Sequence, residues 1–299
     1  MAVHLQNSLQ SLSTIVPYPE LPPELVHNIF HYAARRSTPF CLVLCQVSRW
    51  TRELALPHLY STVIIKNHSA SSDYIKYLGK YYFKFLQHDF QPTTALRSLW
   101  IAAVSDRVVS IFGKCDNVVH LALHADNIFW LVHASSSEWK VLSHEVITRK
   151  QDLHITVIDG KNWALTQFIN VDPTLTTPLF SKISHLRLAK TKDYETDLTI
   201  SHFTRLTHLA VPFYLPSHDL SALERTLAHK SLECLVVVIY VDLVTAEDRL
   251  RVDNWFKDKW VTGKRVSIVE STSKGIQEEW EEEVRGGKNI WSGGVRSTL

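Results

Sequence analysis

A short apolar pattern recurs along the chain and restricts the possible fold more than any other feature. From residue 95 on, segments with the spacing apolar-x-x-apolar-x-apolar return repeatedly. The clear copies are Leu96/Leu99/Ile101, Val118/Leu121/Leu123, Ile183/Leu186/Leu188, Leu206/Leu209/Val211 and Leu232/Leu235/Val237, and the weaker copies are Leu153/Ile155 and Val266/Ile268. Short apolar runs of this kind predict buried β-strands.

The distances between these segments predict how the strands are connected. Their central positions, residues 99, 121, 153, 186, 209, 235 and 266, are 22 to 33 residues apart. Most intervals hold a segment with helical periodicity, namely Ser105 to Phe112, Asn127 to His133, Asn162 to Ile169, Leu220 to Leu227 and Thr245 to Phe256. A strand, a helix and another strand in fixed order predict parallel strands, because a parallel neighbour requires a crossover connection. Repetition at about 20 to 35 residues predicts a solenoid.

The repeated segments resemble leucine-rich repeats, with one departure. That family usually places Asn or Cys three residues after the last leucine, where the side chain satisfies buried backbone groups of the turn. The residues at these positions are Val104, Asp126, Thr191, Tyr214 and Tyr240. We therefore predict an α/β fold in which residues 95–270 form an irregular, strongly tilted LRR-like solenoid with parallel strands. Residues 271–299 are assigned to a C-terminal tail.

Composition excludes several classes of protein. The chain has 299 residues, 45% of them hydrophobic, which suffices for a sizeable core in one or two domains. Its 32 basic and 30 acidic residues give a net charge of +2, which offers no argument for binding nucleic acid or a membrane surface. No apolar run approaches the ~20 residues of a membrane span. With no secretory signal in Met1 to Ile15 and no disulfide spacing among four cysteines, we expect a cytoplasmic or nuclear protein.

The N-terminal part is predicted to be helical. After a flexible leader over residues 1–16, residues 17–65 predict a three-helix unit, and residues 66–94 a connecting helix (Ser71 to Phe90). Proline opens the first helix, where its missing N–H costs nothing. Thr38-Pro39 begins the second helix, and Ser48 caps a third that we expect to end near Pro57.

The first of these helices has more apolar surface than one core needs. Leu25/Ile29 and Val26/Phe30 are apolar pairs on adjoining faces. A three-helix unit of this size cannot bury both faces internally, so the surplus is expected to form an interface.

This unit resembles the F-box. The matching residues are Leu21-Pro22, Glu24-Leu25, Ile29-Phe30, the apolar run Leu42 to Val47, Trp50 and Pro57-x-Leu59-Tyr60. The resemblance covers about 45 residues, and an F-box followed by repeat-like strands is the layout of many substrate receptors, notably in the large F-box families of filamentous and mushroom-forming fungi. The connection from Arg35 to Pro39 lacks the usual acidic-leucine turn, which affects the expected contacts of the second helix.

The resemblance implies a partner and a role. An F-box docks on the Skp-type adaptor of an SCF-type cullin-RING ubiquitin ligase, and the repeat domain then binds a protein substrate. The candidate adaptor-binding residues are Leu21, Pro22, Leu25, Ile29, Phe30, Cys45 and Trp50. Leu54, Leu59 and Val63 are expected to hold the unit to the following domain. Two alternatives stay open: a repeat-domain scaffold that uses an F-box-like module outside ubiquitin ligation, and a helical cap in which residues 20–32 are simply a core helix.

The sequence contains no recognisable catalytic motif, in spite of its sixteen histidines. His27 and His31 lie one helical turn apart, but no Glu completes a zinc-binding helix. His120 and His124 would be about 13 Å apart along a strand, too far to share one metal. No nucleophile elbow, phosphate-binding glycine loop or paired-cysteine spacing occurs. We therefore predict a non-enzymatic chain without a metal or cofactor.

Strand geometry places the candidate substrate surface. If the central leucines point into the core, their sequence neighbours point to the opposite face of the sheet, which we expect to be exposed. The candidate substrate-binding residues there are Trp100, His120, His185, Arg187 and His208. Aromatic residues and arginine dominate interface energies. Neighbouring histidines resist joint protonation, so binding on this face is expected to change between about pH 5 and 7.

Overall fold

The chain divides into two units, Met1–Leu56 and Pro57–Leu299. The computed structural model describes residues 21–67, 69–74, 76, 91–135, 142, 151–159, 168, 177–189, 200–213, 220–259 and 265–292. The expected leader over residues 1–16, most of the connecting helix and all but Phe168 of the expected helix Asn162 to Ile169 lie outside these residues. The two units are described separately.

Three helices make up the N-terminal unit: α1 (Pro23–Arg36), α2 (Thr38–Val47) and α3 (Arg49–Ser61), the last of which continues into the second unit. Ser37 caps α2 by accepting a hydrogen bond from the Phe40 amide. At the start of α3, the Ser48 and Thr51 side chains each accept a hydrogen bond from the other residue's amide, at 3.1 and 3.0 Å. The expectation that α3 ends near Pro57 is wrong, because Pro57 removes one helical N–H without ending the helix.

The core of this unit consists mainly of small side chains. The buried residues of α1 to α3 are Ala34, Cys41, Leu44, Thr51 and Ala55. Two hydrogen bonds join the helices through this core: the Cys41 thiol donates to the Ala34 carbonyl, and the Thr51 hydroxyl donates to the Leu44 carbonyl at 2.7 Å. Small residues allow the helix backbones to approach closely, and they leave most of the large apolar side chains outside.

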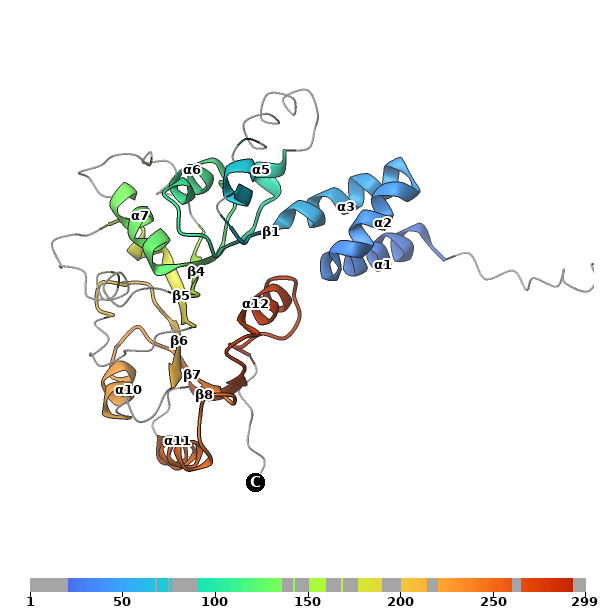
Figure 1. The fold of residues 1–299 in the computed structure, drawn as a ribbon. Helices are drawn as coiled ribbons and strands as arrows, with labels where there is room; N and C mark the ends of the chain where they lie inside the picture. The colour runs from blue at the N-terminus through green and yellow to red at the C-terminus, as the bar shows by residue number, and fades with distance from the viewer. Residues whose placement is uncertain are drawn as a thin grey trace, which may run out of the picture. The chain divides into compact units, whose positions relative to one another are not determined.

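The second unit is built on one eight-stranded parallel sheet, in which strands pair in the order of the sequence (Figure 1). The strands are β1 (Thr62–Ile65), β2 (Ser98–Ile101), β3 (His120–Leu123), β4 (Leu153–Val157), β5 (Ile183–Leu188), β6 (His208–Phe213), β7 (Cys234–Tyr240) and β8 (Arg265–Ser271). All seven segments predicted from the apolar pattern form strands, and the predicted α/β class with parallel strands is confirmed.

Two details of the strand assignment were wrong. The sequence predicts residues 58–65, at the end of the N-terminal unit, to be extended, but only Thr62–Ile65 forms a strand, in which Val63 aligns with Leu99, because α3 continues to Ser61. In β4 the residue aligned with Leu121 and Leu186 is Ile155, not Leu153. The reason is a register shift between Leu153 and His154, where β5 contains one more residue than β4.

Helices cover one face of the sheet. They are α6 (Arg107–Lys114), α7 (Ala125–Ser135), α10 (Leu220–Leu227) and α11 (Ala246–Lys259), and the short helix α5 (Pro92–Ala95) precedes β2. Their apolar side chains and those of Leu99, Leu121, Leu186, Leu209 and Leu235 form one continuous core. One turn in this layer uses a buried asparagine: Asn127 donates to the Ala103 carbonyl and accepts from the Ser105 amide, each at 2.8 Å.

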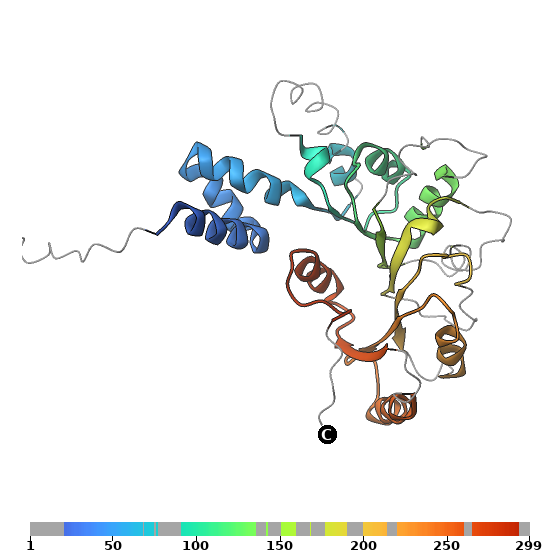
Figure 2. The same ribbon diagram turned by 180° about the vertical axis from the view of Figure 1, so that it is seen from behind.

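The opposite face of the sheet, called the inner face below, is covered by helix α12 (Ile276–Val284) and the turn that follows it (Figure 2). Ile276, Trp280, Ile290 and Trp291 are buried against inner-face residues that include Trp100 and Tyr240. The assignment of residues 271–299 to a tail is therefore wrong for the described part, up to residue 292, which belongs to the folded unit.

We predict that Leu209→Ala lowers the free energy of unfolding by about 2–5 kcal/mol, because the fully buried side chain lies at the centre of the sheet core and its loss leaves a cavity. Leu250→Ala, which removes an exposed leucine of α11, should change it by less than about 0.5 kcal/mol. Urea unfolding followed by circular dichroism measures both. Equal effects of the two variants would contradict the assignment of Leu209 to the core.

Candidate functional site

An exposed apolar surface lies on the N-terminal helical unit. Of the candidate adaptor-binding residues, Leu21, Leu25, Ile29 and Trp50 are 55, 48, 53 and 47% exposed, and Pro22 is also exposed. Phe30 and Cys45 are half-buried. Large apolar side chains that stay half exposed in a folded unit contribute little to its own core, so they are available to a partner.

Aromatic contacts connect part of this surface across the three helices. The Phe30 ring of α1 lies 6.0 Å from the Trp50 ring of α3 and 6.4 Å from the Phe40 ring of α2, measured between centroids. His27 lies 6.3 Å from Trp50. The Arg52 guanidinium of α3 donates to the Cys45 carbonyl at 2.8 Å, which ties α3 to the end of α2. The structure therefore holds Phe30, Trp50 and Cys45 on neighbouring helices within one small unit.

The exposed apolar set is larger than the sequence analysis proposed. It also includes Tyr32 of α1 and Leu42, Val43 and Val47 of α2. The apolar run from Phe40 to Val47 contains the signal, because a helix that is apolar nearly all round cannot bury every side against two partner helices. We call the exposed residues Leu21, Leu25, Ile29, Tyr32, Leu42, Val43, Val47 and Trp50 the helical apolar surface.

The expectation of an exposed substrate face on the sheet is wrong for its two central residues. Trp100 is 5% and Arg187 2% exposed. Both side chains point to the inner face as strand alternation predicts, and they share one row across the strands, since Trp100 aligns with Ala122, Ala122 with Thr156, and Thr156 with Arg187. They are buried because α12 lies over this row, a contact that strand periodicity cannot reveal.

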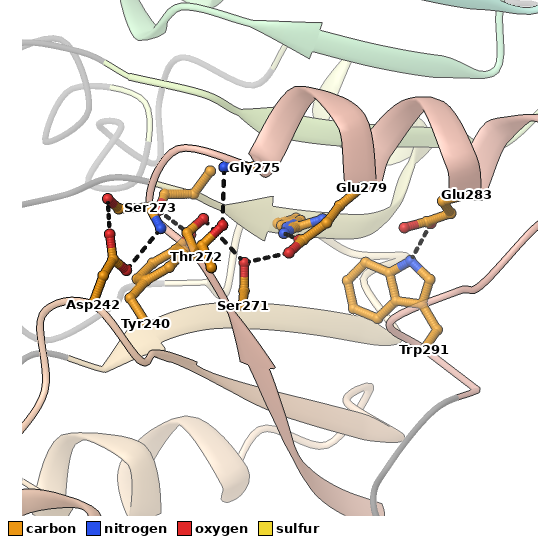
Figure 3. Close-up of polar contacts among 11 residues, drawn as sticks. Tyr240, Asp242, Ser271, Thr272, Ser273, Gly275, Glu279, Glu283 and Trp291 are labelled. Atoms are coloured by element: carbon orange, nitrogen blue, oxygen red, sulfur yellow. Dashed lines mark hydrogen bonds and ion pairs between the residues drawn. The ribbon is translucent and has the colours of Figure 1, made fainter. Parts of the chain in front are cut away.

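Arg187 makes one ion pair across the interface with α12. Its Nη2 lies 2.7 Å from Oε2 of Glu279. The other oxygen, Oε1 of Glu279, accepts a hydrogen bond from the Ser271 hydroxyl at 2.6 Å (Figure 3). The other two guanidinium nitrogens, Nε and Nη1, have no hydrogen-bond partner among the residues that the structure describes. A buried guanidinium with two unsatisfied nitrogens carries a free-energy cost.

Trp100 has a similar environment. Its ring lies 5.4 Å from the ring of Trp280 on α12, and its indole nitrogen has no hydrogen-bond partner in the described part of the chain. The neighbours of Trp100 and Arg187 in the same row include Ala122 and Ala210, whose short side chains leave room for a helix above the sheet.

The predicted histidine row exists and is longer than expected. Strand pairing aligns His120 with His154, His154 with His185, and His185 with His208. Successive ring centroids lie 4.7, 3.8 and 4.2 Å apart, and the last two pairs are stacked. His154 was not predicted, because the pattern was centred on Leu153. The structure aligns Ile155 with the central leucines, so His154 is the residue that precedes the central position.

Trp291 covers one end of the histidine row. Its ring meets His185 and His208 edge-on, at 5.1 and 5.8 Å between centroids. The Trp291 indole nitrogen donates to Oε1 of Glu283 at 3.0 Å (Figure 3). Burial raises the pKa of Glu283, while the charge of Arg187 and the Trp291 hydrogen bond oppose this rise. The segment from Glu279 to Trp291 thus places acidic and aromatic groups on the inner face.

Three histidines of the row, His120, His154 and His185, have lowered pKa values. Burial lowers the pKa of His120 to about 4, and the neighbouring His154 adds to the effect. Burial lowers the pKa of His154 to about 4, although Asp152 opposes this, and burial together with the adjacent histidines lowers that of His185 to about 3. The predicted change between pH 5 and 7 is therefore wrong for the folded chain, because these three imidazoles take up protons only at lower pH.

The described residues were also compared with the requirements of a metal site and of a membrane-spanning helix. No group of three or more His, Cys, Asp and Glu side chains there could hold a metal ion, and no described helix is long and apolar enough to cross a membrane. His124, considered above with His120, instead lies 2.9 Å from an oxygen of Asp126. What the two surfaces offer chemically is non-covalent binding, by apolar contact on the helical unit and by charge and aromatic stacking on the inner face.

Comparison of the chain with models of protein families, with curated proteins and with solved structures gives no match.

We predict that the chain loses stability between about pH 6.5 and pH 4. The unfolded chain binds protons on its histidines near the ordinary value of 6.5, whereas the folded chain does not until about pH 4, so protons favour unfolding in this window. The midpoint of urea unfolding should be constant from pH 7 to 8 and fall steadily below 6.5. The double variant His154→Gln/His185→Gln should show a smaller fall, and an identical fall would contradict the assignment.

Proposed function

We propose that the chain is the substrate-recognition subunit of an SCF-type cullin-RING ubiquitin ligase. In this proposal residues 17–65 are an F-box that docks on a Skp-type adaptor, and the sheet unit is an irregular LRR-like solenoid that holds a protein substrate. The chain itself performs no reaction and uses no cofactor, because the other subunits supply the chemistry. Its four cysteines are free thiols, which fits the reducing cytoplasm or nucleus where such a ligase would act.

The observation that carries the proposal is the helical apolar surface. Twelve large apolar side chains of the described residues are exposed, and eight of them are the residues of this surface, while the other four, Val104, Val241, Leu243 and Leu250, are in the sheet unit. The helical unit is the smaller of the two units, so exposed large apolar side chains are much more frequent in it than in the sheet unit. Large apolar side chains that gather exposed on one small unit favour an interaction site.

The position of these residues supports docking on another protein. They belong to α1, α2 and the start of α3, the same short stretch that carries the F-box-like motif. A stable protein–protein interface buries about 800 Å² on each partner, with an aromatic residue among its energetic anchors. Trp50, half exposed and in contact with Phe30, has the chemistry of such an anchor.

The topology of the sheet unit supports the second half of the proposal. Every strand pairs in parallel with the strand that follows it in sequence, and the apolar pattern returns at each step. Stacked repeats produce this order, because each repeat contacts only its neighbours. In this proposal the substrate binds to the sheet unit, and the helical unit binds the adaptor.

We predict that Leu25→Glu/Ile29→Glu abolishes binding of a Skp-type adaptor, because two charged side chains would have to be buried in an apolar interface. A pull-down with purified adaptor, quantified against wild type, measures the effect. Both residues are about half exposed, so the fold should be retained and the circular dichroism spectrum unchanged.

The matched control is Leu243→Glu/Leu250→Glu, which changes two equally exposed leucines of the sheet unit and should bind the adaptor as wild type does. Wild-type binding by Leu25→Glu/Ile29→Glu would refute the docking assignment. If wild type itself failed to bind any Skp-type adaptor, the chain would have to be a scaffold whose F-box-like module acts outside ubiquitin ligation.

We also predict that the chain is more soluble when it is co-expressed with the adaptor, because the adaptor covers the helical apolar surface and stabilises the bound form by mass action. The measurement is the soluble fraction after expression with and without the adaptor. The Leu25→Glu/Ile29→Glu variant should gain nothing from co-expression, since it cannot bind. Equal solubility of wild type under both conditions would count against an uncovered apolar surface.

A further inference from the structure

Among the described helices of the sheet unit, α12 lies on the inner face, whereas α6, α7, α10 and α11 form the core on the opposite face (Figures 1 and 2). Those four helices belong to the connections between strands, so they are part of the repeating fold. Helix α12 follows the last strand and lies across the inner face from the outside. The strands alone thus form the inner face, and a segment that follows them in the sequence covers it.

The residue types in contact between the inner face and the segment from α12 to Trp291 are more typical of a binding interface than of a protein core. Glu279 pairs with Arg187, Trp280 lies on Trp100, and Trp291 lies on His185. The core beneath the other helices consists mainly of aliphatic and phenylalanine side chains. Tryptophan and arginine are the residue types that most often dominate binding energy in protein interfaces.

The fit between the inner face and α12 is incomplete. Arg187 is almost fully buried, yet Glu279 contacts one of its three nitrogens, and the second oxygen of Glu279 is occupied by Ser271. Nε and Nη1 of Arg187 and the indole nitrogen of Trp100 have no partners in the described part of the structure. A carboxylate that is not held by Ser271 could bind the guanidinium through two hydrogen bonds, which is the stronger geometry.

We propose that the inner face around Arg187 and Trp100 is a recognition site for acidic protein segments that contain tryptophan, and that the segment from Ile276 to Trp291 occupies it as an intramolecular ligand. The partner that displaces this segment carries the same chemistry: a carboxylate for Arg187 and an aromatic ring beside it for Trp100. This inference deepens the proposed substrate-receptor function, and it rests on that function for the conclusion that the displacing segment belongs to a substrate.

The attachment of α12 explains how it would open without unfolding the sheet. Its segment is anchored next to β8, where the Ser273 amide donates to a carboxylate oxygen of Asp242 and the Thr272 hydroxyl accepts from the Gly275 amide (Figure 3). These bonds lie at the start of α12, ahead of the Arg187 contact. Opening would therefore pivot about residues 272–275 and expose Trp100 and Arg187 while β7 and β8 stay paired.

The tether sets the affinity that an external ligand needs. A segment joined by a few residues competes at an effective concentration in the millimolar range. A free segment of similar intrinsic affinity therefore binds poorly to the closed chain. A change that weakens the binding of α12 to the inner face raises the apparent affinity of the free segment by the same factor.

The test uses the full chain and a fluorescein-labelled peptide of residues 274–292. The opened variant Glu279→Ala/Trp280→Ala removes the ion pair of α12 with Arg187 and its ring contact with Trp100, and it changes no residue of the strands. We expect it to bind the peptide at least tenfold more tightly than wild type does, by fluorescence polarisation. Adding Arg187→Met to the opened variant should weaken binding at least tenfold.

Two peptides provide the matched control. A peptide with Glu279→Ala should bind the opened variant at least tenfold more weakly, whereas one with Glu278→Ala should bind as the unchanged peptide does, because Glu278 is exposed and next to Glu279 in sequence. A folded opened variant that fails to bind the unchanged peptide would overturn the proposal. Equal binding of the two altered peptides, or equal binding of the peptide by wild type and opened variant, would overturn it as well.

If the opened variant does not fold, hydrogen exchange of the wild-type chain decides the question. The proposal requires the amides of Glu279 to Val284 to exchange faster than those of β5 to β7, by local opening, and requires excess peptide to increase this difference. Equal exchange in α12 and these strands would show that α12 is a fixed part of the fold and would overturn the proposal. Neither experiment involves the adaptor, so failure here leaves the adaptor pull-down as a separate test of the proposed function.

Discussion

The parallel pairing of each strand with the next one in sequence is the constraint on which the sheet unit depends. A parallel connection must cross over the sheet, and the described crossover helices all cover the same face. That face is therefore closed by the repeats themselves. The other face receives every second side chain of each strand, aligned in rows, and can be covered only by a segment that is not part of a crossover. In this chain α12 covers part of it.

The two faces consequently differ in chemistry. Aliphatic and aromatic groups fill the helix-covered side, while the inner face contains four aligned histidines and a buried arginine. Burying polar groups costs free energy unless they find partners. The lowered pKa values of His120, His154 and His185 reflect this cost, and so do the two nitrogens of Arg187 that have no hydrogen-bond partner among the described residues. The N-terminal unit has the reverse arrangement: its core consists mainly of small residues, and eight of its large apolar side chains are exposed.

Sequence periodicity predicted the local features and missed those that depend on distant segments. The strands around Leu99, Leu186 and Leu209 were found because a buried strand needs apolar residues at fixed spacing. His154 was missed because the pattern was centred on Leu153, whereas Leu153 pairs with Ile183 and Ile155 aligns with the central Leu121 and Leu186. The burial of Arg187 was missed because it arises from Glu279, 92 residues later in the chain. The exposed residues Leu25, Ile29 and Trp50 were predicted correctly as outward-facing, since the small unit has too little interior to hold them.

The central claim is that the chain binds a Skp-type adaptor through its helical unit alone and leaves the sheet available for a substrate. Hydrogen exchange of the full chain, with and without a saturating amount of purified adaptor, tests it most directly. The account predicts added protection of backbone amides within α1, α2 and the first half of α3, with the amides of β2 to β8 unchanged. Protection that appeared in the sheet strands, or no protection in either unit, would contradict the account.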